Sequence, residues 1–468
     1  MKNFNLETIL ENQNSTRQMQ VRLVLRMSLP AILAELTSIA MQYIDAAMVG
    51  SLGANATGAI GLVTSSTWLI GGVCIGMATG FSVQVAQLVG AGRAKEASNI
   101  LRQALTVLLC MGSMIGLIGV LVSKSLPLWL GGSADIVDAA ASYFLIFSCS
   151  IPFALMRQMA AGMMQCSGDM KTPSILSALI CLLDVIFNFF FIFPSREVLI
   201  AGHSVTIPSM GLGVTGAAIG TALSEVVISL VMLYAVCIRN QKLNLLTKGS
   251  WKWEKKILKT AVKIAIPLSM DQIFMCSAYV VGTIIVAPLG TIAVAANSLA
   301  VTAESLCYMP GYGIGSAATA IIGQTIGAGR RDLTKSFSRV SVYLGMILMG
   351  LTAVVMFLAA PFVFSLLTSD PEVAELGTNV LRLELLAEPL YGASICCAGV
   401  FRGAGDTLVP SILNLVSMWC VRIVLAYFLV PVMGLKGYWL SMCIELCFRG
   451  AIFLVRLFRG RWSKKSLV

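Results

Sequence analysis

The sequence has 468 residues, of which 57% are hydrophobic and only 12% are charged, and its mean hydropathy is +0.86. Soluble domains carry about 25% charged residues, so a chain this poor in charge cannot cover a water-exposed surface. This composition argues against soluble enzymes, disordered proteins and nucleic-acid-binding proteins, despite the net charge of +11. It predicts a polytopic membrane protein.

The chain is expected to begin with a polar tail, 1–27, that is not a cleavable signal peptide. Twelve apolar segments then follow, each long enough to cross about 30 Å of hydrocarbon. They lie at 28–50, 57–83, 97–122, 136–160, 173–194, 212–237, 259–286, 293–323, 337–360, 376–399, 408–431 and 435–457. The predicted organisation is an N-lobe (28–238), a basic connector (239–258), a C-lobe (259–457) and a basic tail (458–468).

The basic residues are distributed unevenly among the connections. Of the 33 Lys and Arg residues, 27 lie in the two tails and the even-numbered connections or in the span ends next to them, whereas four lie in or next to the odd-numbered connections. Cytoplasmic loops of membrane proteins carry the excess of Lys and Arg. We therefore expect both termini to be cytoplasmic, and we interpret the positive charge as a topology signal and not as a nucleic-acid-binding surface.

The two halves of the sequence match each other at an offset of 237 residues. Paired residues include Pro30 with Pro267, Gln87 with Gln324, Arg102 with Arg339, Pro152 with Pro389 and Asp169 with Asp406. The register changes after an insertion at 195–209, beyond which Gly216 pairs with Gly437 and Glu225 with Glu445. Each half contains six predicted spans, so the repeats are parallel and related by an axis along the membrane normal. This is a transporter architecture, in which two bundles rock around a central cavity.

Acidic residues inside membrane spans are costly and usually functional. Asp45 lies deep in the first span. Asp184 and Asn188 lie four residues apart in the fifth, so their side chains share one helix face. Such a carboxylate and carboxamide suit a cation site, and a desolvated carboxylate can instead carry a proton. A structural hydrogen bond between helices is the alternative.

The second half contains further intramembrane acids. Asp271, Glu304, Glu384 and Glu388 are candidates for binding substrate or a second ion, and Glu384 and Glu388 share a helix face. Glu35 and Glu225 are similar but weaker candidates.

Other motifs have structural explanations. The two GAGR sequences, 90–93 and 327–330, predict tight turns next to the headgroups. The GxGxxG pattern at 211–216 opens a membrane helix and does not follow a strand, so it does not indicate a nucleotide site. The single histidine, His203, argues against histidine-based metal sites, and the 13 cysteines lie mostly in apolar runs.

These motifs, in this order and duplicated, resemble the multidrug and toxic compound extrusion (MATE) family over nearly the whole chain. The segments that carry the resemblance are 30–53, 87–93, 165–173, 211–221, 309–313, 323–329 and 401–407. The resemblance implies an exporter of amphipathic, often cationic drugs, driven by inward Na⁺ or H⁺. It also implies a monomer in the cell membrane that needs no cofactor beyond its coupling ion.

In one branch of that family the N-lobe cation site resembles the set Asp45, Asp184, Asn188 and Thr221, which would hold a proton or Na⁺. The Asp and Asn on the fifth span are exchanged relative to that branch. In another branch, acids occupy positions that resemble Met275 and Tyr391 here, with Asp271 and Glu388 one turn earlier.

The predicted fold is an all-α polytopic membrane protein of twelve transmembrane helices in two six-helix repeats, and the predicted function is secondary antiport and not enzymatic catalysis. Two rivals remain. A flippase for lipid-linked precursors would place Arg157 or Arg422 in the central cavity. An intramembrane aspartyl protease would use the GxGD aspartate Asp406 facing Asp45.

Overall fold

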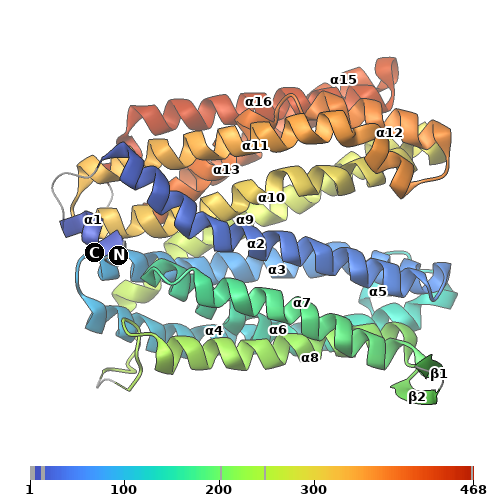
Figure 1. Cartoon of the computed structure of the whole chain (residues 1–468), viewed down its shortest axis with the longest axis horizontal. Helices are drawn as coiled ribbons and strands as arrows, with labels where there is room; N and C mark the ends of the chain where they lie inside the picture. The colour runs from blue at the N-terminus through green and yellow to red at the C-terminus, as the bar shows by residue number, and fades with distance from the viewer. Residues whose placement is uncertain (1–5, 12–15, 201–202, 247–248, 465–466, 468) are drawn as a thin grey trace.

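The computed structural model describes residues 6–11, 16–200, 203–246, 249–464 and 467. Most of them form long helices that run side by side along one axis of the molecule, with both termini at the same end (Figure 1). We call this end the termini end. The helices form two lobes, as the repeat predicts, and the segment after η1 leads from the first lobe to the second.

The N-lobe begins with the short helix α1 (Leu6–Glu11) and ends with a π-helical turn. Its helices are α2 (Arg17–Gly50), α3 (Ala54–Gly90), α4 (Ala94–Val122), α5 (Leu126–Trp129), α6 (Ala134–Ser167), α7 (Lys171–Ile192), α8 (Gly213–Tyr234) and η1 (Ala235–Arg239). The range 1–27, predicted as a tail, thus contains α1 and the start of α2.

The C-lobe has the same order of long helices, several of them interrupted. Its elements are α9 (Lys255–Val286), η2 (Ala287–Leu289), α10 (Thr291–Gly327), α11 (Arg331–Leu367), α12 (Pro371–Glu384), α13 (Glu388–Gly403), α14 (Leu408–Val416), η3 (Ser417–Ile423), α15 (Val424–Met433), α16 (Leu435–Arg459) and η4 (Arg461–Lys464).

Among the described residues, ten helices are long and apolar enough to cross a membrane, and an eleventh span results if α12 and α13 are joined. The expected continuous span at 376–399 is therefore wrong in detail, because the chain bends by 58° between Glu384 and Glu388. Pro389 follows the bend and cannot donate the backbone hydrogen bond that would extend α12. The twelfth predicted span is α16, whose 25 residues lie alongside the other helices but include several charged side chains. The count of twelve stays a prediction.

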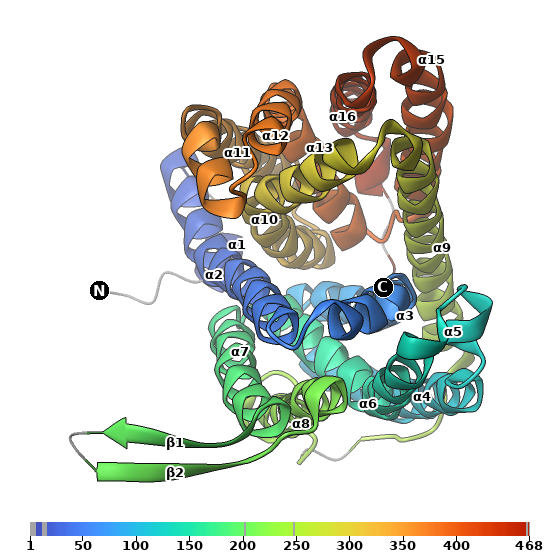
Figure 2. The same ribbon diagram turned by 90° about the vertical axis from the view of Figure 1, so that its right-hand side faces the viewer.

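The insertion that lengthens the first half is a β-hairpin, which the all-α expectation did not include. Strands β1 (Pro194–Ile200) and β2 (His203–Met210) pair in antiparallel fashion, with Pro194 opposite Met210. The hairpin connects α7 to α8 and projects sideways from the N-lobe at the end opposite the termini (Figure 2). It shifts the repeat register without altering the helices on either side of it.

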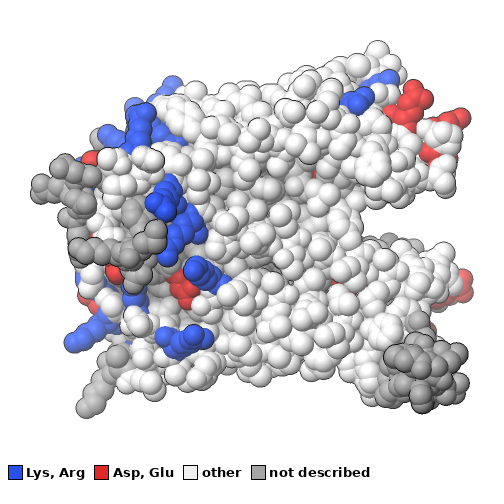
Figure 3. All heavy atoms as spheres, in the orientation of Figure 1, with Lys and Arg blue, Asp and Glu red and all other residues white. Residues whose placement is uncertain are grey.

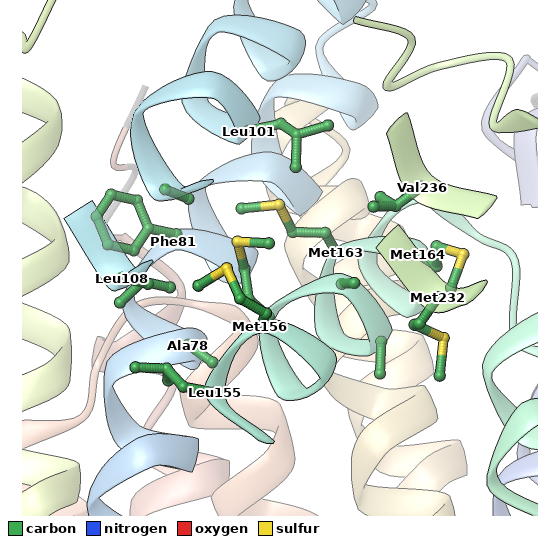
Figure 4. Packing of buried hydrophobic residues seen from close by; sticks show 14 of the residues in the cluster. Ala78, Phe81, Leu101, Leu108, Leu155, Met156, Met163, Met164, Met232 and Val236 are labelled. Atoms are coloured by element: carbon green, nitrogen blue, oxygen red, sulfur yellow. The ribbon is translucent and has the colours of Figure 1, made fainter. Parts of the chain in front are cut away.

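Each lobe has its own apolar core. In the N-lobe, methionines from α6 and α8 pack with Phe81, Leu101 and Leu108 from α3 and α4 (Figure 4). Met156, Met159, Met163 and Met232 are at most 3% exposed. These flexible thioethers fill the gaps between tightly packed helices. These four methionines are therefore part of the core of the lobe.

The lobes meet through α2 and α3 on one side and α9 and α10 on the other. Small residues line these crossings: Gly80 lies against the backbone of Ala261, and Gly313 lies against Ile32. Small residues allow membrane helices to approach closely where no hydrophobic effect drives them together. At the end opposite the termini the lobes diverge, and the surface is hollowed between them (Figure 3).

Most Lys and Arg side chains on the face shown in Figure 3 gather at the termini end, with a few at the other end, and acidic side chains are visible at both ends. This matches the charge distribution expected from the sequence. The assignment of the termini end to the cytoplasm stays a prediction from this distribution.

At the termini end, two glutamines related by the repeat join the lobes. Gln87 in α3 donates from Nε2 to the carbonyl oxygen of Gly403 (3.2 Å), and Gln324 in α10 donates from Nε2 to that of Cys166 (2.7 Å). Cys166 and Gly403 are themselves repeat partners. Gly90 and Gly327 sit directly against the backbone of the opposite glutamine, so a Cβ at either glycine would overlap it. The GAGR glycines thus serve helix contact as well as the expected turn.

Replacing both glutamines by alanine should favour separation of the lobes at the termini end. Each buried hydrogen bond contributes about 1 kcal/mol. Losing both should therefore shift the ratio of molecules with separated lobes to molecules with joined lobes roughly 30-fold. Double electron–electron resonance between spin labels at Lys95 and Asp332, in a background without native cysteines, measures this separation. The control Gln18→Ala changes an exposed glutamine. An unchanged distance distribution in the double variant would show that the glutamines do not hold the lobes together.

Candidate functional site

In the N-lobe, three of the predicted site residues come together between α2 and α7. Asn188 donates from Nδ2 to Asp45 Oδ1 and to Asp184 Oδ2, both at 2.9 Å. Asp184 and Asn188 are 0% and 1% exposed, and Asp45 is half-buried. The spacing of four residues places Asp184 and Asn188 on the face of α7 that meets α2 and α8. One amide group therefore bridges two carboxylates from different helices.

The other amide atom, Asn188 Oδ1, is buried and lacks a hydrogen-bond partner within the described residues. It lies against Gly220 in α8, where any side chain would overlap it. A buried acceptor without a partner costs free energy unless a water or a cation supplies the contact. Two carboxylates and a free amide oxygen form a donor set suited to a cation, and either carboxylate can instead hold a proton.

Helix α8 closes the third side of this cluster. Ser224 Oγ lies 3.3 Å from Asp184 Oδ1 and 2.8 Å from the carbonyl oxygen of Thr221, to either of which it can donate. Thr221, the predicted neutral ligand, lies one turn before Ser224 in the same helix. Ser224 was not among the predicted site residues, although its position three residues after Thr221 places both on one helix face and provides a signal for it.

In the C-lobe the predicted residues separate into two groups. Asp271, Met275 and Tyr391 line a cavity of about 170 Å³ between α9, α13 and α14. Asn414 donates from Nδ2 to Asp271 Oδ2 at 3.0 Å, and Arg402 and Arg449 also line this cavity. Asp271 Oδ1, Arg402 Nε and Ser411 Oγ are buried there without partners among the residues described. The cavity is therefore polar, lined by two carboxylates, those of Asp271 and Asp406, and by two guanidinium groups.

The other group consists of buried glutamates outside this cavity. Glu304 is 7% exposed, and Glu384 and Glu388, on either side of the α12–α13 bend, are 0% exposed. All four carboxyl oxygens of Glu384 and Glu388 lack hydrogen-bond partners in the described part of the chain. Burying unpaired carboxylates is prohibitively costly, so these groups must be protonated or neutralised by a cation. The sequence groups them with Asp271 as candidates, but none of the three lines the cavity that Asp271 faces.

Two further acids are paired with arginines. Glu445 in α16 accepts from Arg422 at 2.7 Å and from Arg449 at 2.8 Å, and Ser417 Oγ donates to it at 2.6 Å. All three charged groups are buried, with exposed side-chain fractions of 0% to 6%. In the N-lobe, Arg157 pairs with Glu225, the repeat partner of Glu445, at 2.5 Å. Arg157 and Arg422, which the flippase hypothesis requires in the central cavity, thus both have carboxylate partners.

The intramembrane protease hypothesis is wrong. Asp45 lies in the N-lobe beside Asn188, whereas Asp406 is buried in the C-lobe and forms an ion pair with Arg456. The two aspartates therefore cannot act on one peptide bond. Asp169 accepts a hydrogen bond from the backbone nitrogen of Thr172 at 3.1 Å, as expected for a residue that caps the start of α7.

Comparison with known proteins identifies relatives of similar length. The chain is 24% identical over 450 residues to the probable multidrug resistance protein NorM of Thermotoga maritima, covering 95% of this chain and 94% of the relative. It is 26% identical over 459 residues to the multidrug resistance protein MdtK of Yersinia pestis, covering 96% of both chains.

Solved structures share the fold. The chain superposes with a TM-score of 0.88 on an outward-facing multidrug resistance MATE family transporter, at 21% identity and covering 100% of this chain and 99% of that one. A MOP superfamily transporter from Pyrococcus furiosus gives the same TM-score at 20% identity and the same coverage.

The MatE family model matches residues 30–190 and 267–428. The two matches begin at Pro30 and Pro267, which are the first pair of the internal repeat, and one match falls in each lobe. Together they span more than half of the chain. This multi-span membrane protein therefore belongs to the MatE family.

Proposed function

We propose that this protein is a secondary antiporter that exports amphipathic, cationic small molecules in exchange for inward Na⁺ or H⁺. The observation that carries the proposal is the cluster of Asp45, Asp184 and Asn188, with its unpartnered amide oxygen, on helices that reach the contact between the lobes. The names of the two multidrug resistance relatives support a drug as the exported substrate.

In the proposed cycle, the hollow between the lobes receives the coupling ion from outside the cell. Binding of Na⁺ or a proton between Asp45 and Asp184 cancels one of their two negative charges, which relieves the repulsion between the carboxylates and allows α2 and α7 to pack more tightly. The lobes then separate at the termini end and close at the other. Thr221 and Ser224 would act as neutral ligands from α8.

The C-lobe candidates would serve substrate or a second ion. Glu304, Glu384 and Glu388 are proposed to hold protons or a cation, because their burial without partners requires neutralisation. Asp271, Met275 and Tyr391 are proposed to contact substrate from the polar cavity. We further propose that the protein acts as a monomer in the cell membrane with both termini in the cytoplasm, and that it needs no cofactor other than the coupling ion.

Reconstitution of the protein into liposomes tests the function. Inward gradients of Na⁺ and of protons are imposed separately. Export of a fluorescent amphipathic cation such as ethidium should occur only with the gradient of the coupling ion. The matched control is Asp138→Asn, which removes an exposed acid from the same lobe. Absence of transport with either gradient, from correctly inserted protein, would overturn the proposal.

A further inference from the structure

A second type of site lies outside the transport machinery, on the C-lobe at the termini end. A hollow of about 210 Å³ separates the start of α11 from the end of α16. Its charged lining residues are all cations: Arg331, Lys335, Arg339 and Arg459. Ser338 and Ser463 also line it, and no acidic side chain among the described residues does. We call it the basic hollow.

The four cations have no carboxylate partner within the part of the chain that the structure describes. Arg339 instead stacks on the ring of Phe458, with Cζ 5.9 Å from the ring centroid. Stacking on one face leaves the guanidinium edge free to donate hydrogen bonds. Clustered cations repel each other, so an anion in the basic hollow would be bound favourably.

An apolar groove of about 470 Å³ adjoins the basic hollow and shares Lys335, Arg339 and Phe458 with it. It follows α11 away from the termini end along Val340, Tyr343, Leu344 and Ile347. Tyr343 and Ile347 are 50% and 60% exposed. The only acid in its lining, Asp332, already binds Arg330 at 2.9 Å. The combined surface is therefore cationic at the membrane boundary and apolar toward the membrane interior.

The repeat allows the basic hollow to be compared with the equivalent surface of the N-lobe, which is covered. In the N-lobe, the repeat partner of Arg339 is Arg102, which is 2% exposed and donates to the carbonyl oxygen of Leu245 at 3.1 Å. The partner of Lys335 is Ser98, whose Oγ lies 3.4 Å from the carbonyl oxygen of Lys242. Trp253 Nε1 also donates to Thr106 at 3.1 Å. The connector thus covers the N-lobe surface that corresponds to the basic hollow.

Among the residues that the structure describes, no segment covers the C-lobe surface in the same way. Leu467, the one described residue after η4, lies at the lobe contact, where its backbone nitrogen donates to Gln87 Oε1 at 2.9 Å. Arg339 and Lys335 consequently remain exposed, whereas their N-lobe counterparts are buried.

We propose that an anionic phospholipid occupies this C-lobe surface, with its phosphate in the basic hollow and an acyl chain in the apolar groove. A phosphodiester offers the charge and the acceptor oxygens that guanidinium and ammonium groups bind. The position at the membrane boundary and the continuous apolar groove favour a lipid over a soluble anion. The lipid would cover α11 and α16 as the connector covers α4 and η1.

Native mass spectrometry of the full-length protein in mild detergent tests the proposal, with phosphatidylglycerol and phosphatidylcholine as probes. The wild type should retain one phosphatidylglycerol in preference to phosphatidylcholine. A basic residue near a membrane surface contributes a factor of about five in lipid affinity, so Lys335→Gln with Arg339→Gln should weaken binding about 30-fold. The matched control Lys255→Gln with Lys256→Gln removes two exposed charges of the connector end and should bind like the wild type.

The independent pair Arg331→Gln with Arg459→Gln should show a similar loss, and all variants should elute as the wild type does in size-exclusion chromatography. Wild-type binding by both hollow variants would overturn the site. Equal weakening in the connector control would reduce the effect to general surface charge and overturn it as well. Displacement of phosphatidylglycerol by an excess of inorganic phosphate or glycerol 3-phosphate would identify a free-anion site and overturn the choice of a phospholipid.

Discussion

Replacing Asp184 by asparagine is expected to reduce ion-coupled export roughly 10- to 100-fold. Asp184 is fully buried, and its two oxygens lie near Asn188 and Ser224. Asparagine keeps the shape but removes a charge, and a contact to a charged group is worth about 1.5–3 kcal/mol. Initial export rates in proteoliposomes, at matched protein content, measure the loss. Full activity in this variant would show that the pair with Asn188 is only structural.

The double variant Asp184→Asn with Asn188→Asp tests whether charge or position governs the site. It restores one carboxylate to α7 and should recover substantial transport. The new carboxylate would stand where Asn188 now contacts Asp45 at 2.9 Å, so the two acids could coexist only with a proton or cation between them. We therefore expect a stronger dependence on the coupling ion than in the wild type. An inactive double variant of normal stability would indicate a strict geometry.

Replacing Glu445 by glutamine should destabilise the protein by about 3–5 kcal/mol, because it leaves two buried arginines without a counter-charge. Arg422 and Arg449 are 5% and 6% exposed and bind the same carboxylate. Thermal unfolding in detergent, followed by a thiol-reactive dye, measures the change because buried native thiols such as Cys396 and Cys397 become accessible on unfolding.

Two comparisons isolate the cause of this loss. Glu96→Gln breaks the ion pair between Glu96 and Arg93, whose side chains are 50% and 47% exposed. This change should lower the free energy of unfolding by less than about 1 kcal/mol. Replacing all three buried charges, Arg422→Met, Arg449→Met and Glu445→Leu, should recover much of the stability, since apolar residues avoid the desolvation cost. Equal unfolding temperatures for Glu445→Gln and the wild type would mean that water reaches the arginines.

The N-lobe site could be anticipated from the sequence because its members are intramembrane polar residues on short helical spacings. Asp45 and the pair Asp184 and Asn188 stand out in apolar runs, and the structure brings them within hydrogen-bond distance. The C-lobe site could not be anticipated in the same way. Glu388 and Asp271 both stand out as acids, but only Asp271 lines the polar cavity, because the rotation of α13 turns Tyr391 and not Glu388 toward it.

Length, hydropathy and charge alone determined that this protein spans a membrane with long helices, and the offset of 237 residues alone determined its two related lobes. Local signals suffice for these features, because a helix in lipid must satisfy its own backbone hydrogen bonds. The rotation of each helix was decided only by tertiary packing. Lipid and protein core are both apolar, so hydropathy does not indicate which face of a membrane helix turns inward. Three features depend on that rotation: the pairing of Glu445 with Arg422 and Arg449, the hydrogen bonds of Gln87 and Gln324 to the opposite lobe, and the open basic hollow beside Arg339.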